Sequence, residues 1–247
     1  MGICALAVLG VACGGGDGDD AADSSITVLA ATSLTDAFTD IGEAFGATHP
    51  DTTVELLFEG SSTLAGQIVE RAPADVFASA DLANMTRVVD AGLTADEPAI
   101  FATNLLAIVV EAGNPRGITS IEDLADPDLV VALCEPEQPC RSYSDRIFAA
   151  AGMAVPESAQ VANVAAVTNA VRTGEADAGI AYVTNLVAAG DDVDLVEIPE
   201  ELDVAAEYPI APLSGSEAPD AAQAFVEFVL GADGQAILGA HGFGPPP

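Results

Sequence analysis

Basic side chains are scarce in this 247-residue sequence, which holds 6 Lys and Arg against 39 Asp and Glu and carries a net charge of −33. Nucleic acids and anionic membranes are bound through clustered cations, so the charge balance argues against both as partners. There are two histidines and no tryptophan. Histidine, the side chain that most often serves as a catalytic acid or base, is therefore scarce.

Apolar residues, by contrast, are plentiful. They make up 50% of the chain, and the mean hydropathy is +0.39. The negative charge thus reflects missing Lys and Arg and not a missing core, which excludes disorder throughout the chain. The length allows one large domain or two lobes of about 100 residues each.

The first residues have the pattern of a processing signal. Residues 2–12 form an apolar run that is too short to span a bilayer, and Cys13 and a Gly/Asp-rich stretch follow at once. This pattern resembles a bacterial lipoprotein signal, so we expect residues 1–12 to be removed and Cys13 to carry lipid. No Lys or Arg precedes the apolar run, which indicates that the natural start lies upstream. The alternative is a buried N-terminal strand or helix.

Residues 13–24 are too poor in apolar side chains to fold and are expected to form a flexible tether. If Cys4 is removed and Cys13 is acylated, Cys134 and Cys140 remain as an even pair. In an oxidising compartment outside the cytoplasm, these two thiols would form a disulfide. A zinc site is the competing interpretation, although two thiols without a nearby histidine are an incomplete set of ligands.

From residue 25 onward, short apolar runs alternate with segments of helical periodicity, which is typical of α/β proteins with parallel strands. The first unit is a βαβαβ arrangement with right-handed crossovers. Its expected strands are 26–30, 53–58 and 75–78, and its expected helices are 33–47, 62–71 and 82–91.

A second cycle of strands and helices begins at residue 105. Apolar runs at 105–110, 121–124, 129–133, 178–182 and 193–197 accompany expected helices at 143–151 and 164–173. The chain then closes with a strand at 205–213 and helices at 218–230 and 234–240. After residue 12, no apolar run is long enough for a membrane span.

Two turns between a strand and a helix carry hydroxyl residues. They are 30–36, which contains Ser33, and 58–64, which contains Ser61. In open α/β sheets, ligands bind where strands end and helix N-termini present unpaired N–H groups. Two equivalent hydroxyl-rich turns in one unit predict convergent donors for one ligand. The alternative is that each serine only caps the N-terminus of its helix.

Several segments in one order resemble a known family. They are 26–37, 61–68, 72–81, 104–110, 174–182, 207–210 and 241–243. Together they are similar to the molybdate-binding substrate-binding proteins of molybdate ABC transporters, over about residues 26–243. Residues 135–162 match least well. The resemblance implies an α/β periplasmic binding protein of type II, with two lobes, each a mixed sheet flanked by helices, and a two-strand hinge.

The resemblance also implies a ligand set in which every group is a hydrogen-bond donor. Ser33 and Ser61 match serines that donate both the hydroxyl and the backbone N–H. Tyr182 matches a tyrosine that donates its phenolic O–H, and Val164 matches a residue that donates its backbone N–H. The remaining backbone donor falls on Cys140, so a disulfide to Cys134 would brace this ligand loop. Molybdenum would thus be held as its oxyanion, with no cofactor.

A site made only of N–H and O–H donors favours a fully deprotonated dianion over hydrogen phosphate, whose proton needs an acceptor. Molybdate and tungstate meet this condition. Sulfate does too, so a sulfate-binding protein of the same fold is the first alternative. Arg141 either touches the anion or faces solvent. Carboxylates near the turns are expected to support helix dipoles or the hinge; these are Asp36, Glu59, Asp75 and Asp81.

An alternative of a different class is a secreted α/β serine hydrolase that uses Ser33 or Ser61. His49 and His241 are distant in sequence from any Ser-Asp pair, and Gly60-Ser61-Ser62 is not the Gly-x-Ser-x-Gly elbow, so a catalytic triad is a poor fit. The sequence therefore predicts a binding protein that is not an enzyme.

The expected protein lies outside the cytoplasm, is monomeric, is attached to the membrane through lipid on Cys13, and delivers its oxyanion to a membrane permease. Lobe I is expected at 25–103 plus 207–244, and lobe II at 104–206. The crossings near Asn104 and Glu207 would form the hinge, and a ligand that contacts both lobes would favour the closed form.

Overall fold

The structure, a computed structural model, describes residues 24–156, 159–199, 201–202 and 204–247. The expected signal peptide, the lipidation site Cys13 and nearly all of the expected tether lie outside these residues. Among the helices that the structure describes, none is long and apolar enough to cross a membrane.

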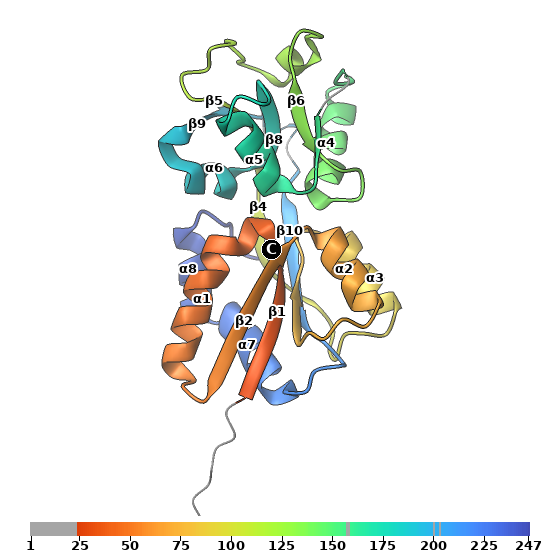
Figure 1. The fold of residues 1–247 in the computed structure, drawn as a ribbon, viewed down its shortest axis with the longest axis vertical. Coiled ribbons are helices and arrows are strands. Elements are labelled where there is room, and N and C mark those ends of the chain that lie inside the picture. The colour runs from red at the N-terminus through yellow and green to blue at the C-terminus, as the bar shows by residue number, and fades with distance from the viewer. Residues whose placement is uncertain (1–23, 157–158, 200, 203) are drawn as a thin grey trace, which may run out of the picture.

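The first sheet has five strands in the order β2-β1-β3-β10-β4. Its strands are β1 (Ser24–Ala31), β2 (Thr52–Glu59), β3 (Val76–Ala78), β4 (Ala99–Asn104) and β10 (Ala206–Pro212). Strands β2, β1 and β3 are parallel, and β10 runs antiparallel to β3 and β4. The sheet is therefore mixed, and its three parallel strands end at the side that faces the second lobe (Figure 1).

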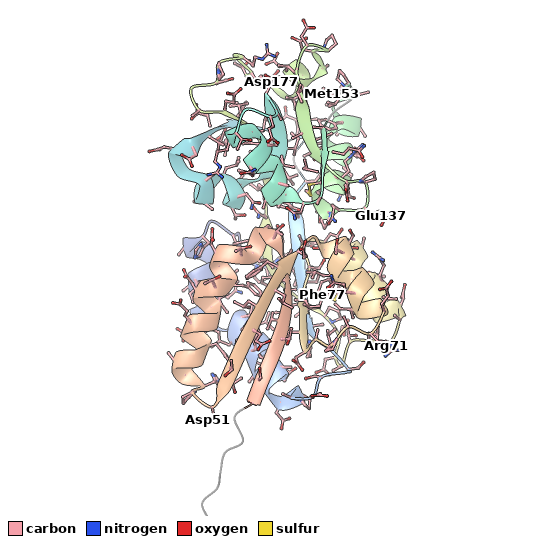
Figure 2. The ribbon with its side chains drawn as sticks, viewed as in Figure 1. Asp51, Arg71, Phe77, Glu137, Met153 and Asp177 are labelled. Carbon is pink, nitrogen blue, oxygen red and sulfur yellow. A yellow bond between two sulfur atoms is a disulfide. The ribbon has the colours of Figure 1, made fainter. Side chains whose placement is uncertain are left out.

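Helices cover both faces of the first sheet. Successive residues of β1 point to opposite faces, and the apolar side chains on each face are buried by helices. Ile26 and Val28 pack in the core with α1 and α7, whereas Leu29 and Phe77 pack in a second cluster with α2 and α3. Figure 2 shows Phe77 inside this lobe, between the sheet and those two helices. The helices are α1 (Thr35–Thr48), α2 (Ser61–Val69), α3 (Leu82–Asp90), α7 (Pro219–Leu230) and α8 (Ala232–Ala240). A 3-10 turn at Thr32–Leu34 precedes α1.

The second sheet has five strands in the order β7-β6-β8-β5-β9. They are β5 (Leu106–Glu111), β6 (Val131–Cys134), β7 (Ala159–Val161), β8 (Ala178–Tyr182) and β9 (Val193–Glu197). Strands β7, β6 and β8 are parallel, and β5 is antiparallel to β8 and β9. Helices α4 (Pro139–Ala150), α5 (Val164–Arg172) and α6 (Val183–Ala189) flank it. This sheet is mixed too, as expected.

The chain crosses between the sheets twice. Strand β4 ends at Asn104 in the first sheet and β5 begins at Leu106 in the second, and the return path runs from β9 to β10. Asn104 and Ala206 are register partners, so the two crossings lie side by side (Figure 1). The C-terminal segment also reaches the crossings, where Gly244 pairs with Thr103 of β4.

Several expected boundaries were wrong. Helix α4 begins at Pro139 and not near residue 143, which puts Cys140 in its first turn. Strands β4 and β7 and helix α6 were not expected, and the apolar run at 121–124 lies in a 3-10 helix (Ile121–Ala125). Proline at the first helical position explains the early start of α4, because it fixes φ and lacks only an N–H that the helix leaves unpaired.

Candidate functional site

A small cavity lies between the two lobes. Its walls come from the turn before α1, the start of α2, the end of β8 and the starts of α4 and α5. The cavity volume is about 10 Å³, far below the roughly 300–1,000 Å³ typical of pockets for organic ligands. The lining residues are Ala31, Thr32, Ser33, Gly60, Ser61, Ala80, Gln138, Pro139, Cys140, Asn163, Val164 and Tyr182. The structure thus brings together all the ligand residues that the resemblance implied.

The cavity is lined by helix beginnings, where N–H groups have no partner within the helix. Ser61 and Val164 are the first residues of α2 and α5, and Cys140 is the second residue of α4. Helix α5 starts there because the Asn163 side chain caps it by accepting from the N–H of Ala166 at 3.0 Å. These helices point their positive ends at one space, which favours an anion.

Every residue that lines the cavity is uncharged. The acidic residues near the turns are not among the described residues that line the cavity; they are Asp36, Glu59, Asp75 and Asp81. Asp81 caps α3 instead, accepting from the N–H of Asn84, and burial raises the pKa of its carboxyl. Asp75 accepts from the N–H of Thr27 at 2.7 Å and from the hydroxyl of Ser216, just before the start of α7. An anion in the cavity would thus meet dipoles and hydroxyls and no opposing lining carboxylate.

Ser61 is held so that its hydroxyl proton is free. The backbone N–H of Ala80 donates to Ser61 Oγ at 3.0 Å, and a backbone N–H can only donate. Ser61 is 1% exposed, so its own proton needs an acceptor inside the cavity. The capping alternative is wrong here, because Gly60 is the N-cap of α2 and no side chain caps that helix.

Ser33 lies deep in the first lobe and shares a hydrogen bond of 3.0 Å with the hydroxyl of Tyr208. It too is not a cap, because Ala31 and Leu34 hold the N-cap positions of the 3-10 turn and of α1, and neither has a side-chain cap bond. The sequence offered no signal for this contact, because Ser33 and Tyr208 are 175 residues apart.

Tyr182 ends β8 with its side chain 1% exposed. Its hydroxyl is buried and has no hydrogen-bond partner among the described residues. Burial, followed by the neighbouring Tyr208 and Tyr143, raises the pKa of Tyr182 well above the usual 10.0. The phenol therefore keeps its proton at neutral pH. An unpartnered buried donor costs free energy, and an oxyanion in the cavity would satisfy it.

Cys134 and Cys140 are joined by a disulfide with an S–S distance of 2.01 Å. The bond ties the end of β6 to the first turn of α4, next to the cavity. Arg141 does not line the cavity, and its Nε donates to Asp145 at 2.8 Å on the same helix. Arg141 is thus paired with Asp145 through Nε, while its buried Nη1 has no hydrogen-bond partner among the described residues.

Gln138 is a cavity residue that sequence reasoning missed. It is 3% exposed, and its Oε1 is buried without a partner among the described residues. Gln138 approaches Gly60 of the other lobe so closely that a Cβ on Gly60 would lie 2.4 Å from Gln138 Oε1. Figure 2 shows the preceding residue, Glu137, at the side of the second lobe that faces the first. Glycine at position 60 therefore permits this contact between lobes.

The two histidines take part in other contacts. The ring of His49 stacks on Phe45 with centroids 4.1 Å apart, and His241 Nε2 lies 2.8 Å from Asp40 Oδ2. Neither histidine lines the cavity. Over the described part of the chain, no group of three or more His, Cys, Asp and Glu is placed to hold a metal ion.

Two lobes on mixed sheets, two adjacent crossings and an uncharged cavity between helix N-termini define a solute-binding protein. The chain belongs to the family of bacterial extracellular solute-binding proteins, whose model matches residues 26–244. Members of this family bind solutes and are not enzymes, so the hydrolase alternative falls away.

Curated relatives point the same way. The chain is 45% identical over 222 residues to the molybdate-binding protein ModA of Mycobacterium bovis, covering 90% of this chain and 85% of that protein. It is 29% identical to the molybdate-binding protein ModA of Escherichia coli, covering 90% and 89%.

Solved structures share the fold. The periplasmic molybdate-binding protein of Azotobacter vinelandii matches with a TM-score of 0.79 at 18% identity, covering 90% of this chain and 100% of that one. The sulfate-binding protein SubI of Mycobacterium tuberculosis matches with a TM-score of 0.82 at 22% identity, covering 90% and 87%. The expected fold class, a two-lobed periplasmic binding protein, is confirmed.

Proposed function

We propose that this protein captures molybdate or tungstate outside the cytoplasm and delivers it to the membrane permease of an ABC transporter. The observation that carries the proposal is the buried, unpartnered hydroxyl of Tyr182 in a cavity lined by uncharged groups. The 45% identity to a molybdate-binding protein over 90% of the chain supports the choice of ligand.

The ligand is held by donors from both lobes. Ser33 and Ser61 donate from the first lobe through their hydroxyl and backbone N–H groups. From the second lobe, Tyr182 donates its O–H, and Cys140 and Val164 donate backbone N–H groups. Support comes from their common position on the cavity wall and from the helix starts at Ser61, Cys140 and Val164. An anion bonded to both walls holds the lobes together.

A cavity lined only by hydrogen-bond donors selects among anions by their protonation state. Each oxygen of molybdate, tungstate or sulfate only accepts, so these dianions match a cavity of donors, whereas hydrogen phosphate brings a proton that needs an acceptor. Sulfate-binding is the second candidate function, favoured by the TM-score of 0.82 to a sulfate-binding protein. The likeness at 22% identity supports the fold and leaves the ligand to be measured.

The remaining features of the proposal concern how the protein is organised and attached. Lobe I comprises 25–103 and 207–244, and lobe II comprises 104–206, in keeping with the membership of the two sheets. The hinge lies at the crossings near Asn104 and Glu207. The mature protein is a monomer attached through lipid on Cys13, which a mass measurement of the mature N-terminus would test.

Calorimetric titration with molybdate, tungstate, sulfate and phosphate tests the function. We expect molybdate or tungstate to bind with a Kd below about 1 μM, or roughly −8 kcal/mol, and phosphate to bind far more weakly. Tighter binding of sulfate than of both metal oxyanions would favour the second candidate. The absence of binding by all four anions would overturn the proposal.

A further inference from the structure

A chain of buried hydrogen bonds runs from the hinge to the cavity. Asn104 Nδ2 donates to the hydroxyl of Tyr208 at 3.3 Å, and that hydroxyl shares a bond of 3.0 Å with Ser33 Oγ. Asn104 is 3% exposed, Tyr208 is 0% exposed and Ser33 is 8% exposed. Water therefore has little access to these groups, and each must find its partner within the chain.

The direction of the chain is fixed at the hinge. The backbone N–H of Leu105 donates to Asn104 Oδ1 at 3.0 Å, which makes Oδ1 the acceptor and leaves Nδ2 as the donor facing Tyr208. Nδ2 also donates to Thr184 Oγ1 of the second lobe at 2.8 Å. Because the Tyr208 oxygen accepts a hydrogen bond from Asn104, the Tyr208 O–H is left to donate to Ser33 Oγ. Ser33 then keeps its hydroxyl proton for the cavity.

Tyr208 is built to stay a donor. Burial, the largest cause, raises the pKa of its phenol, so the hydroxyl keeps its proton. The ring packs against Phe101, Tyr182 and Phe243, with centroids 6.2, 5.8 and 5.4 Å away. These contacts hold the ring in place without the hydroxyl, so the hydroxyl can be removed with the packing left intact.

We infer that Tyr208 and Asn104 are positioning residues that make Ser33 an obligate donor and thereby set the preference for a fully deprotonated anion. The inference rests on the proposed function and deepens it. When Tyr208 is in place, the Ser33 proton points at the ligand. Without the Tyr208 hydroxyl, Ser33 is free to turn and accept a hydrogen bond from the O–H of hydrogen phosphate.

The test compares Tyr208→Phe with the wild-type protein by calorimetric titration with molybdate and with phosphate at neutral pH. We expect the variant to bind molybdate about tenfold more weakly, because a charge-assisted bond from Ser33 is no longer oriented. Phosphate binding should be retained or strengthened, so the ratio of the phosphate Kd to the molybdate Kd should fall by about tenfold or more. If Tyr208 had only a structural role, the variant would bind both anions more weakly by the same factor.

Thr184→Val is the matched control. It removes one buried hydrogen bond of Asn104 at the hinge but leaves the bond from Asn104 to Tyr208 in place. We expect the ratio of phosphate Kd to molybdate Kd of Thr184→Val to match that of the wild-type protein. Asn104→Ala, which removes the donor that orients Tyr208, should lower the ratio as Tyr208→Phe does.

The outcomes separate the two proposals. A Tyr208→Phe variant whose ratio of phosphate Kd to molybdate Kd equals that of the wild type would overturn the inference while the proposed function stands. A Thr184→Val variant with the same loss of selectivity would also overturn it, because the effect would then belong to the hinge. Wild-type protein that binds none of the anions would overturn the proposed function and the inference with it.

Discussion

At the scale of single residues, we expect the hydroxyls of Ser33 and Ser61 each to contribute to molybdate affinity. Ser61 accepts from the N–H of Ala80 and Ser33 shares a hydrogen bond with Tyr208, so both serine oxygens are held in place. We expect Ser33→Ala and Ser61→Ala each to weaken molybdate binding by about 1.5–3 kcal/mol, as charge-assisted hydrogen bonds are lost. Calorimetry would measure both.

Ser62→Ala is the matched control for the serines, since Ser62 adjoins Ser61 on α2 but does not line the cavity. Its affinity should equal that of the wild type. Wild-type affinity in both Ser33→Ala and Ser61→Ala would show that neither hydroxyl binds the ligand.

Tyr182 predicts a pH dependence. Its folded-state pKa lies well above 10.0 because of burial, whereas the phenol in the unfolded chain ionises near 10. Above that pH the folded state binds more protons than the unfolded state, so the free energy of unfolding falls as pH rises, by up to about 1.4 kcal/mol per pH unit for this group. Below it, the O–H persists and molybdate affinity should not change between pH 7 and 9.

Urea unfolding at several pH values between 8 and 11 measures this effect. Tyr182→Phe should lose less stability than the wild type above pH 10, and it should bind molybdate more weakly at pH 7. An equal alkaline loss in both proteins would contradict the assignment of the buried phenol.

At the scale of elements, the start of α2 controls whether the lobes can meet. A Cβ at Gly60 would lie 2.4 Å from Gln138 Oε1 across the cavity. We expect Gly60→Ala to displace the amide of Gln138, the far end of a flexible side chain, and thereby to weaken molybdate binding by about 1 kcal/mol, the low end of the cost of overpacking. Calorimetry would detect the change.

Gly66→Ala provides the control on the same helix, because a Cβ there meets nothing within 4 Å. It should leave affinity unchanged and stabilise the fold by roughly 0.5–1 kcal/mol, since alanine favours a helix interior. Replacing Gln138 by Ala in the Gly60→Ala protein should restore part of the affinity. If it restores none, the contact does not explain the loss.

The disulfide predicts an effect of reductant. It joins the end of β6 to the first turn of α4, where Cys140 lines the cavity. Reduction should free this segment and weaken molybdate binding, because the donor would have to be ordered again on binding. Titration with and without reductant measures this, and the Cys134→Ser/Cys140→Ser variant should be indifferent to reductant. Unchanged affinity of the reduced wild type would show that the bond does not brace the site.

Local sequence patterns predicted most elements but not the links between distant ones. The strand expected at 26–30 is Ser24–Ala31, and the helix expected at 164–173 is Val164–Arg172, because apolar periodicity is a local signal. Strand β4 was missed because its pattern, Ala-Ile-Phe-Ala-Thr-Asn, is weakly alternating and its partner β10 lies about a hundred residues away. Long-range pairing supplies such a strand with its stability.

The residues of the site also fall into those that the sequence could predict and those that it could not. Ser33 and Ser61 could be predicted, since a strand, a small-residue turn and a helix start mark them in the sequence. Tyr208 and Gln138 could not, because their importance depends on contacts with Ser33 and Gly60 in other parts of the chain.

At the scale of the whole molecule, the net charge of −33 opposes the approach of a dianion. Short-range dipoles act at contact, whereas the surface charge acts at a distance and is screened beyond about 8 Å in physiological salt. We expect the association rate of molybdate to rise severalfold between low salt and 0.5 M NaCl, with little change in the dissociation rate. Stopped-flow tyrosine fluorescence would follow it, since Tyr182 lines the cavity. An association rate that stays flat or falls with salt would contradict this.

The direction of β1 has a practical consequence. Ser24 begins the strand at the pole of the first lobe, and the strand runs toward the cavity for eight residues (Figure 1). At about 3.3 Å per residue, roughly 26 Å separates the start of the strand from the anion cavity. Any attachment made ahead of Ser24, whether to a membrane or to a sensor chip, would hold the protein by its far end and leave the mouth between the lobes free to open.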